Sequence, residues 1–283
     1  MRISPTRQIS LDAAPASLWD GARRIVSTGD LDEKIRISHA TARSWFARAL
    51  SLRERTGGQP MPAQPGRPET PLLLPPRDMP KRAVGGQAGR IALLHSLAHI
   101  ELNAVDLTWD LVGRFAGHRI PRSFFDDWVR VGLEEAKHFS LLRKRLADVG
   151  SSYGALPAHH GLWEAAESTG NDLTARLAVI PLVLEARGLD ISPNMIAKAR
   201  RTGDWETADI LEIIYRDEKR HVAFGAKWFR FLCDRERTDP EARFQHLVRR
   251  HFKGGLKPPF NDRARAEAGL TPGFYRPLVR LTG

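Results

Sequence analysis

Apolar residues recur at helical spacing through most of the chain between residues 88 and 252. In the first such stretch they include Leu93, Leu97 and Ile100, and no proline interrupts them before residue 117. Apolar positions three and four residues apart line one face of a helix, so the pattern predicts helices rather than strands. Glycines and prolines divide the pattern into predicted helices over residues 88–116, 122–149, 162–187, 193–201, 205–233 and 240–252. The predicted fold class is all-α, with an interruption of the third helix at Gly188 and Pro193.

Two further segments flank these helices. Residues 1–56 also read as helical, with helix starts at Ser10 and Ser17 and a helix from Ile37 to Leu52. Residues 57–88 are rich in proline and glycine, which predicts an extended strap lying over the main helices. The predicted organisation is N-terminal helices and a strap over residues 1–86, a four-helix bundle over 87–253, and an extended C-terminal tail over 254–283.

Composition limits the class of protein. The chain has 283 residues, enough for a full core, and its apolar content of 42% is ordinary. No apolar run follows the N-terminus, and no stretch approaches the roughly 20 apolar residues of a membrane helix. Cys233 is the single cysteine, which rules out an intrachain disulfide and argues against thiolate metal sites. We therefore expect a cytoplasmic protein without membrane attachment.

The charge is strongly basic, at +11, and the excess is uneven. Residues 237–283 contribute much of it, including Arg249, Arg250 and Lys253. A basic surface attracts nucleic acid, anionic lipid or an acidic small molecule. It is equally typical of a soluble protein from an arginine-rich proteome. No RNA-binding or helix-turn-helix motif accompanies the charge, so nucleic acid is an alternative partner rather than the expected one.

One signal occurs twice: a lone glutamate, then a Glu-x-x-His. The first copy is Glu101 followed by Glu135-Ala-Lys-His138, and the second is Glu185 followed by Glu218-Lys-Arg-His221. The two glutamates of a copy are 34 residues apart in the first and 33 in the second. Glutamate and histidine three residues apart lie on one helix face, so each pair offers two metal donors in one direction. Four carboxylates and two imidazoles in this pattern are the ligands of a di-metal four-helix bundle.

The predicted turns agree with this interpretation. An antiparallel helical hairpin brings residues equidistant from its turn to the same height. The midpoint between Glu101 and Glu135 falls at His118, within the predicted break at 117–121, and the midpoint of the second copy falls beside Gly203. The ten residues 151–160 span at most about 35 Å when extended, long enough for the crossover between the two hairpins.

The ligand types indicate the metals. Carboxylate oxygens with imidazole nitrogens suit iron or manganese, whereas thiolates would have favoured zinc or an iron–sulfur cluster. We expect two Fe ions, with Mn or mixed Fe/Mn as the alternative, and O2 as the co-reactant. His95 and His99 share a different helix face from Glu101, so they are expected to pack rather than to bind metal.

Other residues are expected around the metals. Metal-bound histidines usually donate their second N–H to a carboxylate, so we expect Asp217 to orient His138 and Glu134 to orient His221. Tyr215, one turn before Glu218, is either close to the metals or part of the core. Pro181 should bend the third helix beside Glu185, where a bulge would open a coordination position. Apolar residues one turn from the ligands are expected to line a substrate cavity: Leu97, Ala98, Val131, Leu142, Leu182, Ile214 and Gly225.

Four stretches resemble a known family. They are His95-Ser-Leu-Ala-His-Ile-Glu-Leu-Asn-Ala-Val-Asp-Leu, Glu134-Glu-Ala-Lys-His-Phe-Ser-Leu-Leu, Leu184-Glu-Ala-Arg-Gly-Leu-Asp and Arg216-Asp-Glu-Lys-Arg-His-Val-Ala. They resemble the ferritin-like family known as domain of unknown function 455, over about residues 20–270. The resemblance implies a ferritin-like bundle with a di-metal site and implies no settled activity. The ligand layout is more distantly similar to the tRNA-modifying di-iron hydroxylase.

The expected function is that of a non-haem di-iron oxidoreductase, an oxygenase or hydroxylase acting on a small organic substrate, with an electron donor as a further partner. Extra segments at both ends would obstruct cage packing, so we expect a monomer or dimer. One alternative is a ferroxidase or iron-handling protein. Others are a hydroxylase that modifies tRNA or another nucleic acid, and a non-enzymatic scaffold whose basic surface binds nucleic acid.

Overall fold

The structure is a computed structural model that describes residues 15–53, 60–80, 85–159, 161–253 and 255–279. Almost every described element is a helix, and the two strands, β1 (Leu73–Leu74) and β2 (Ala158–His159), form one short parallel pair. The all-α prediction is confirmed. Within the described ranges, every helix is too short or too polar to cross a lipid bilayer.

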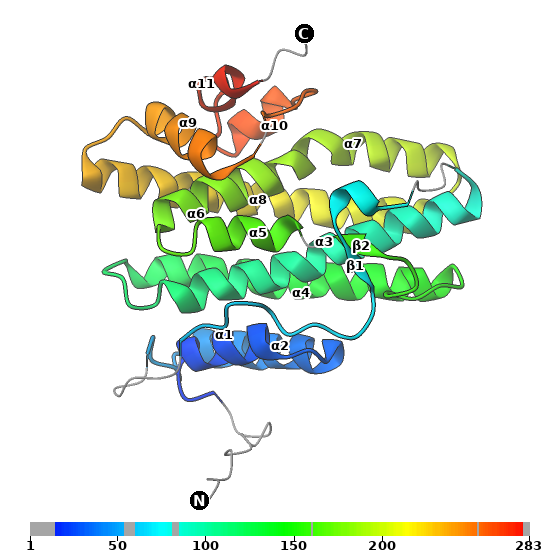
Figure 1. Cartoon of the computed structure of the whole chain (residues 1–283), viewed down its shortest axis with the longest axis horizontal. Helices are drawn as coiled ribbons and strands as arrows, with labels where there is room; N and C mark the ends of the chain where they lie inside the picture. Colours follow the sequence, from blue (N-terminus) through cyan, green and yellow to red (C-terminus); the bar gives the residue numbers. More distant parts are fainter. Residues whose placement is uncertain (1–14, 54–59, 81–84, 160, 254, 280–283) are drawn as a thin grey trace, which may run out of the picture.

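Two long helical hairpins form the centre of the molecule (Figure 1). The first pairs α3 (Gly86–Arg114) with α4 (Arg122–Asp148), and the second pairs α7 (Ala186–Arg201) with α8 (Trp205–Glu236). Helix α4 also packs on α8, which joins the two hairpins. The turns fall at residues 115–121 and 202–204, where the midpoints of the repeated signal place them.

The third long segment differs from its prediction. A short helix, α5 (Gly161–Ser168), ends before a break at 169–172, and a new helix begins with α6 (Leu173–Val179) because Asp172 caps it by accepting from the amide of Ala175. This helix continues through a π-helical turn, η2 (Ile180–Glu185), directly into α7. A helix begins at Gly161, beside the predicted start at residue 162, but it does not continue to Arg187, and the predicted interruption at Gly188 and Pro193 is wrong.

A partner far away in sequence explains how α7 contains a proline. Pro193 has no N–H, so it cannot bond to the carbonyl of Leu189 one turn earlier. The side-chain amide of Asn261 donates to that carbonyl at 3.1 Å instead. The backbone amide of Asn261 also donates to Oδ1 of Asp190 at 2.9 Å. The C-terminal segment thus satisfies the helix where the proline would otherwise break it.

The C-terminal segment is not the extended tail that was predicted. After α9 (Pro240–His251) it forms α10 (Asp262–Glu267), α11 (Pro272–Tyr275) and the turn η3 (Arg276–Leu278). Asn261 caps α10 by accepting from the amide of Ala264. Phe274 and Tyr275 are buried against the main helices. These aromatic contacts are long-range, which is why helical periodicity alone missed the short helices.

Two helices precede the hairpins and lie along one side of them, and the strap runs from these helices across the first hairpin to β1 (Figure 1). Helix α1 (Leu18–Ser27) begins after the predicted cap Ser17, and α2 (Leu31–Phe46) begins earlier than predicted because Asp30 caps it. The predicted start at Ser10 lies outside the described residues. The described part of the strap is extended apart from the turn η1 (Pro76–Asp78). β1 of the strap pairs with β2, in the loop before α5.

His95 and His99 hold the connection between the hairpins. Nε2 of His95 accepts from the amide of Gly154 at 3.0 Å. The ring nitrogens of His99 are hydrogen-bonded to the Tyr153 hydroxyl at 2.9 Å and to the His159 carbonyl at 2.7 Å. Burial lowers the pKa of His99 to about 4, so its ring is neutral. Both histidines therefore anchor the loop.

Candidate metal centre

Four helical segments direct acidic and imidazole side chains into one buried region. Helix α3 contributes Glu101, and Glu185 ends the π-helical turn η2. Helices α4 and α8 each contribute a Glu-x-x-His, and their two imidazole rings lie 5.9 Å apart between centroids. All six residues singled out in the sequence meet in two overlapping groups.

The two groups share carboxylates. One contains Glu101, Glu135, His138 and Glu218, and the other contains Glu185, Glu218 and His221, with donor atoms within 4.8 Å of one another in each group. Glu135 also reaches both: Oε1 lies 2.9 Å from Nδ1 of His221, and Oε2 lies 3.6 Å from Nδ1 of His138. On the α3 side, Oε2 of Glu101 lies 3.3 Å from the same nitrogen of His138. Two carboxylates, Glu135 and Glu218, thus stand between the two groups.

Most of the candidate metal-binding atoms in this region lack a well-aligned hydrogen bond. Among the described residues these atoms are Oε2 of Glu101, both oxygens of Glu135, Oε2 of Glu185, Oε2 of Glu218, and Nδ1 of His138 and His221, although Oε1 of Glu135 lies 2.9 Å from Nδ1 of His221. Buried polar groups are nearly always paired, and leaving one unpaired costs about 1–3 kcal/mol. Seven such atoms facing one another fit two cations with oxygen and nitrogen ligands.

The pKa values describe the same conflict of charges. Burial raises the pKa of Glu101 to about 8. Burial, together with repulsion from Glu218 and Glu135, raises the pKa of Glu185 well above its usual range. Burial opposes the charge of Glu135 too, but the neighbouring His221 and His138 hold its pKa below the usual range. The region cannot ionise all four carboxylates by itself, and divalent cations would remove that restriction.

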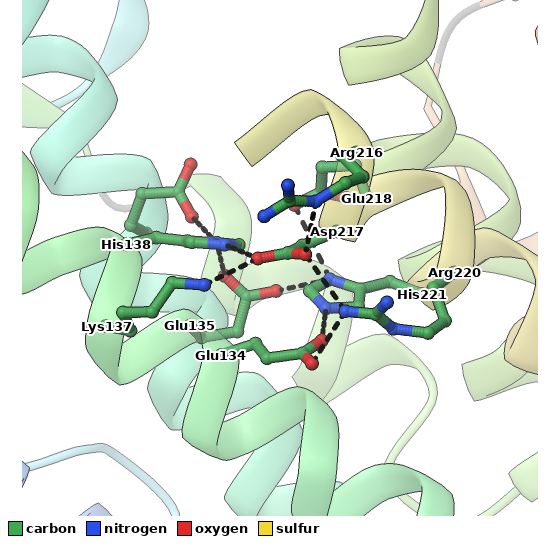
Figure 2. A network of polar contacts seen from close by, with 10 residues as sticks. Glu134, Glu135, Lys137, His138, Arg216, Asp217, Glu218, Arg220 and His221 are labelled. Carbon is green, nitrogen blue, oxygen red and sulfur yellow. Dashed lines mark hydrogen bonds and ion pairs between the residues drawn. The ribbon is translucent and has the colours of Figure 1, made fainter. Parts of the chain in front are cut away.

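A second layer of charges fixes the histidines (Figure 2). Nε2 of His138 lies 3.1 Å from Oδ2 of Asp217, on the opposite helix, and Nε2 of His221 lies 2.9 Å from Oε2 of Glu134. Both contacts were expected from the sequence. Because Nε2–H donates outward to a carboxylate, Nδ1 of each ring faces the other candidate ligands, and this nitrogen can bind a metal that displaces its proton.

Basic residues complete this layer at the surface. Lys137 donates to Asp217 at 2.8 Å, and Nη2 of Arg220 donates both to Asp217 at 2.9 Å and to Glu134 at 2.7 Å. These cations neutralise the carboxylates that orient the rings. Sequence reasoning missed them, although the signal was present: an acid, glutamate, any residue, a base and histidine recur as Glu134-Glu-Ala-Lys-His138 and Asp217-Glu-Lys-Arg-His221.

The family model described as "Protein of unknown function (DUF455)" matches residues 27–276. The chain belongs to the DUF455 family. It is also 40% identical over 209 residues to an uncharacterised protein of Haemophilus influenzae, covering 72% of this chain and 73% of that protein. No solved structure matches the chain.

The DUF455 chain is irregular beside Glu185, as Pro181 predicts. The π-helical turn η2 contains Pro181 and ends at Glu185. π-helical turns inside α-helices are frequent at functional sites. Helix α8 accommodates the turn at Gly225, where a Cβ atom would lie 2.6 Å from Cβ of Pro181. Pro181 therefore occupies the space at Gly225, which does not face a cavity.

The remaining predicted neighbours of the site in this DUF455 chain are mostly core residues. The Tyr215 hydroxyl lies 3.2 Å from the side-chain amide of Asn261, and its ring packs against the apolar core. The structure favours the core interpretation of Tyr215. Two surface hollows, of about 470 and 400 Å³, are lined by none of the six candidate ligands, although Tyr215 lines the second. Of the apolar residues expected to line a cavity, Leu97 is half-buried and these are buried in the packed core: Ala98, Val131, Leu142, Leu182 and Ile214.

Proposed function

We propose that this DUF455 protein is a ferritin-like di-metal oxidoreductase that uses O2 to oxidise a small organic substrate. The observation that carries the proposal is the pair of overlapping carboxylate–imidazole groups with unsatisfied inward donors. Two metals would be held by the six residues of the two groups, with Glu101 and His138 in one, Glu185 and His221 in the other, and Glu135 and Glu218 lying between them. Iron or manganese pairs held in this way supply redox chemistry with O2 that zinc cannot perform.

The chain's own residues have three tasks in this proposal. The six ligands, all on helices packed by an apolar core, hold the donor set rigidly. Asp217 and Glu134 keep both imidazoles in the tautomer that binds metal. Burial of Glu135 and His138 excludes water, which strengthens every interaction of the metals with their ligands.

Metal content tests the site. The protein is purified with iron supplied, and iron and manganese per chain are measured for the wild type, Glu135→Ala and Glu218→Ala. We expect about two metals per wild-type chain and loss of both in each variant, because each substitution removes a carboxylate shared by the two positions. Asp209→Ala, which removes an exposed carboxylate of α8, is the matched control. A wild type that binds far less than two metals rejects the proposal.

Oxygen consumption tests the chemistry. The ferrous protein is mixed with O2 with and without fractions of small molecules from cell extract. We expect consumption beyond the amount that oxidises the bound iron only when a fraction supplies the substrate and an electron donor. Continuous oxidation of added ferrous iron, without any organic compound, would instead identify a ferroxidase.

A further inference from the structure

Gly188 occupies a special position relative to the metal ligands. It follows Glu185 by three residues, the same offset by which His138 follows Glu135 and His221 follows Glu218. Residues three apart share a helix face, so position 188 is directed toward the same region as Glu185. At this offset α4 and α8 carry a ligand, whereas α7 carries no side chain.

Packing does not account for this glycine. A Cβ atom at Gly188 would meet a single atom within 4 Å, Cγ of Glu218 at 3.9 Å. Three glycines of the other long helices are closely packed: the same atom would lie 2.5 Å from Met61 at Gly113, 2.9 Å from Trp109 at Gly132 and 2.6 Å from Pro181 at Gly225. Glycine inside a helix costs roughly 1 kcal/mol relative to alanine. At Gly188 the absence of a side chain has this cost, and it leaves space beside Glu218, a candidate metal ligand.

Exposure indicates that this space is on the accessible side. Glu185 and Gly188 are half-buried, while the other five ligand residues are buried. Opposite, the ion pairs among Asp217, Lys137 and Arg220 cover the histidines. Of the six candidate ligands, Glu185 on the α7 side is thus the most exposed residue, although its Oε2 atom is itself buried.

The neighbouring long side chain is held away from this space. Arg187 donates through Nη1 to the carbonyls of Lys257 and Pro259, at 2.9 and 3.0 Å. These bonds direct its guanidinium toward the C-terminal segment. The charged group nearest to Gly188 in sequence is thus fixed elsewhere.

We propose that Gly188 is the aperture through which small ligands reach the metal pair, and that its missing side chain sets their maximum width. The ligand class is slender molecules that bind a metal through one terminal atom, such as O2 and triatomic anions. This inference rests on the proposed di-metal function. A larger side chain at position 188 closes the aperture without removing any residue that would bind the metals.

Azide binding to the diferric protein tests the proposal. The charge-transfer absorption of the bound azide measures its Kd. Three variants are compared with the wild type: Gly188→Leu, Gly188→Ala and Ala197→Leu. Ala197 is an exposed residue of the same helix, so its substitution is the matched control for added leucine volume. We expect about two irons per chain in all four proteins, and an azide Kd raised at least about tenfold in Gly188→Leu, since blocked pockets discriminate by this order. Ala197→Leu should match the wild type.

Each possible result of the azide titration supports or overturns the proposed aperture. An unchanged azide Kd in a Gly188→Leu protein that retains two irons overturns the aperture, as does a wild type with two irons that binds no azide. If Gly188→Leu loses iron, Gly188→Ala carries the test, because its methyl group stands in ordinary contact with Glu218. An azide Kd that does not rise in Gly188→Ala then overturns the proposal. A wild type with far less than two metals rejects the di-metal function itself, which separates the two failures.

Discussion

The two sides of the candidate metal centre are built differently. Between α4 and α8 the helices are regular, the histidines are fully buried, and carboxylates and basic residues brace them from outside. Along α7 the helix contains a π-helical turn, Glu185 is half-buried, and Gly188 leaves space beside Glu218. The helices that hold the histidines rigidly, α4 and α8, thus differ from the helix that leaves space beside the candidate ligands, α7. The rigidity of the histidines therefore does not restrict access to the site.

Proton binding by the metal-free protein gives the largest expected effect, because groups on both sides titrate together. Glu101 and Glu185, on the α3 and α7 side, have raised pKa values, and so do His138 and His221. The folded metal-free protein therefore holds protons that the unfolded chain has released. Its free energy of unfolding should fall as pH rises from about 5 through 8 and beyond.

Urea unfolding of metal-free protein at pH 6 and pH 8 measures this effect. Added Mn²⁺ should stabilise the protein more at the higher pH, because metal binding displaces those protons. Equal stability of the metal-free protein at both pH values would contradict the predicted proton uptake.

Asp190→Ala should weaken the α7 side most among single substitutions. Asp190 makes two bonds to the buried guanidinium of Arg265, at 2.8 and 2.7 Å, just after Glu185 in the chain. Removing one partner of a buried pair costs about 3–5 kcal/mol, since the other charge stays buried. Chemical denaturation measures the loss, and Asp190→Ala with Arg265→Met should recover part of it. A loss below about 1 kcal/mol would mean that α7 does not depend on this pair.

Asp217→Asn and Glu134→Gln test the bracing between α4 and α8. Substituting a residue that orients a metal ligand typically lowers metal affinity by about 10–100-fold. Asp217→Asn should have the larger effect, because Asp217 bonds to His138, Lys137 and Arg220, whereas Glu134 bonds to His221 and Arg220. Competition with a coloured chelator measures both affinities. The reverse order would show that the charge network does not govern histidine orientation.

Two alanine substitutions at helical glycines give the smallest effects and opposite signs. Gly225→Ala places a methyl group 2.6 Å from Pro181, and such overpacking costs typically about 1–3 kcal/mol. Gly188→Ala meets only ordinary contact, so it should stabilise the metal-free protein by up to about 1 kcal/mol through helix propensity. Thermal unfolding of both metal-free variants checks the signs. Destabilisation by Gly188→Ala would show that the space beside Glu218 is smaller than described.

Local signals in the sequence predicted the position of the six candidate ligands. Helical periodicity placed Glu135 and His138 on one face, and glycine and proline marked the turns that bring Glu101 and Glu185 beside the other donors. The continuity of α7 could not be predicted in the same way. It depends on Asn261, about 70 residues away, which bonds to the carbonyl that Pro193 leaves free. The helices of the C-terminal segment likewise depend on aromatic contacts with distant residues.

The short parallel pair between β1 and β2 also bears on the order of folding. It joins Leu73 to Ala158 and Leu74 to His159, and the whole first hairpin lies between these residues in the chain. Contacts between distant residues form late, because closing a long loop costs entropy before the contact repays it. The strap therefore docks only after α3 and α4 have paired and the loop before α5 is in place. Helices α1 and α2 pack directly on α3 and α4, so their protection from amide hydrogen exchange should appear before that of the strap during refolding.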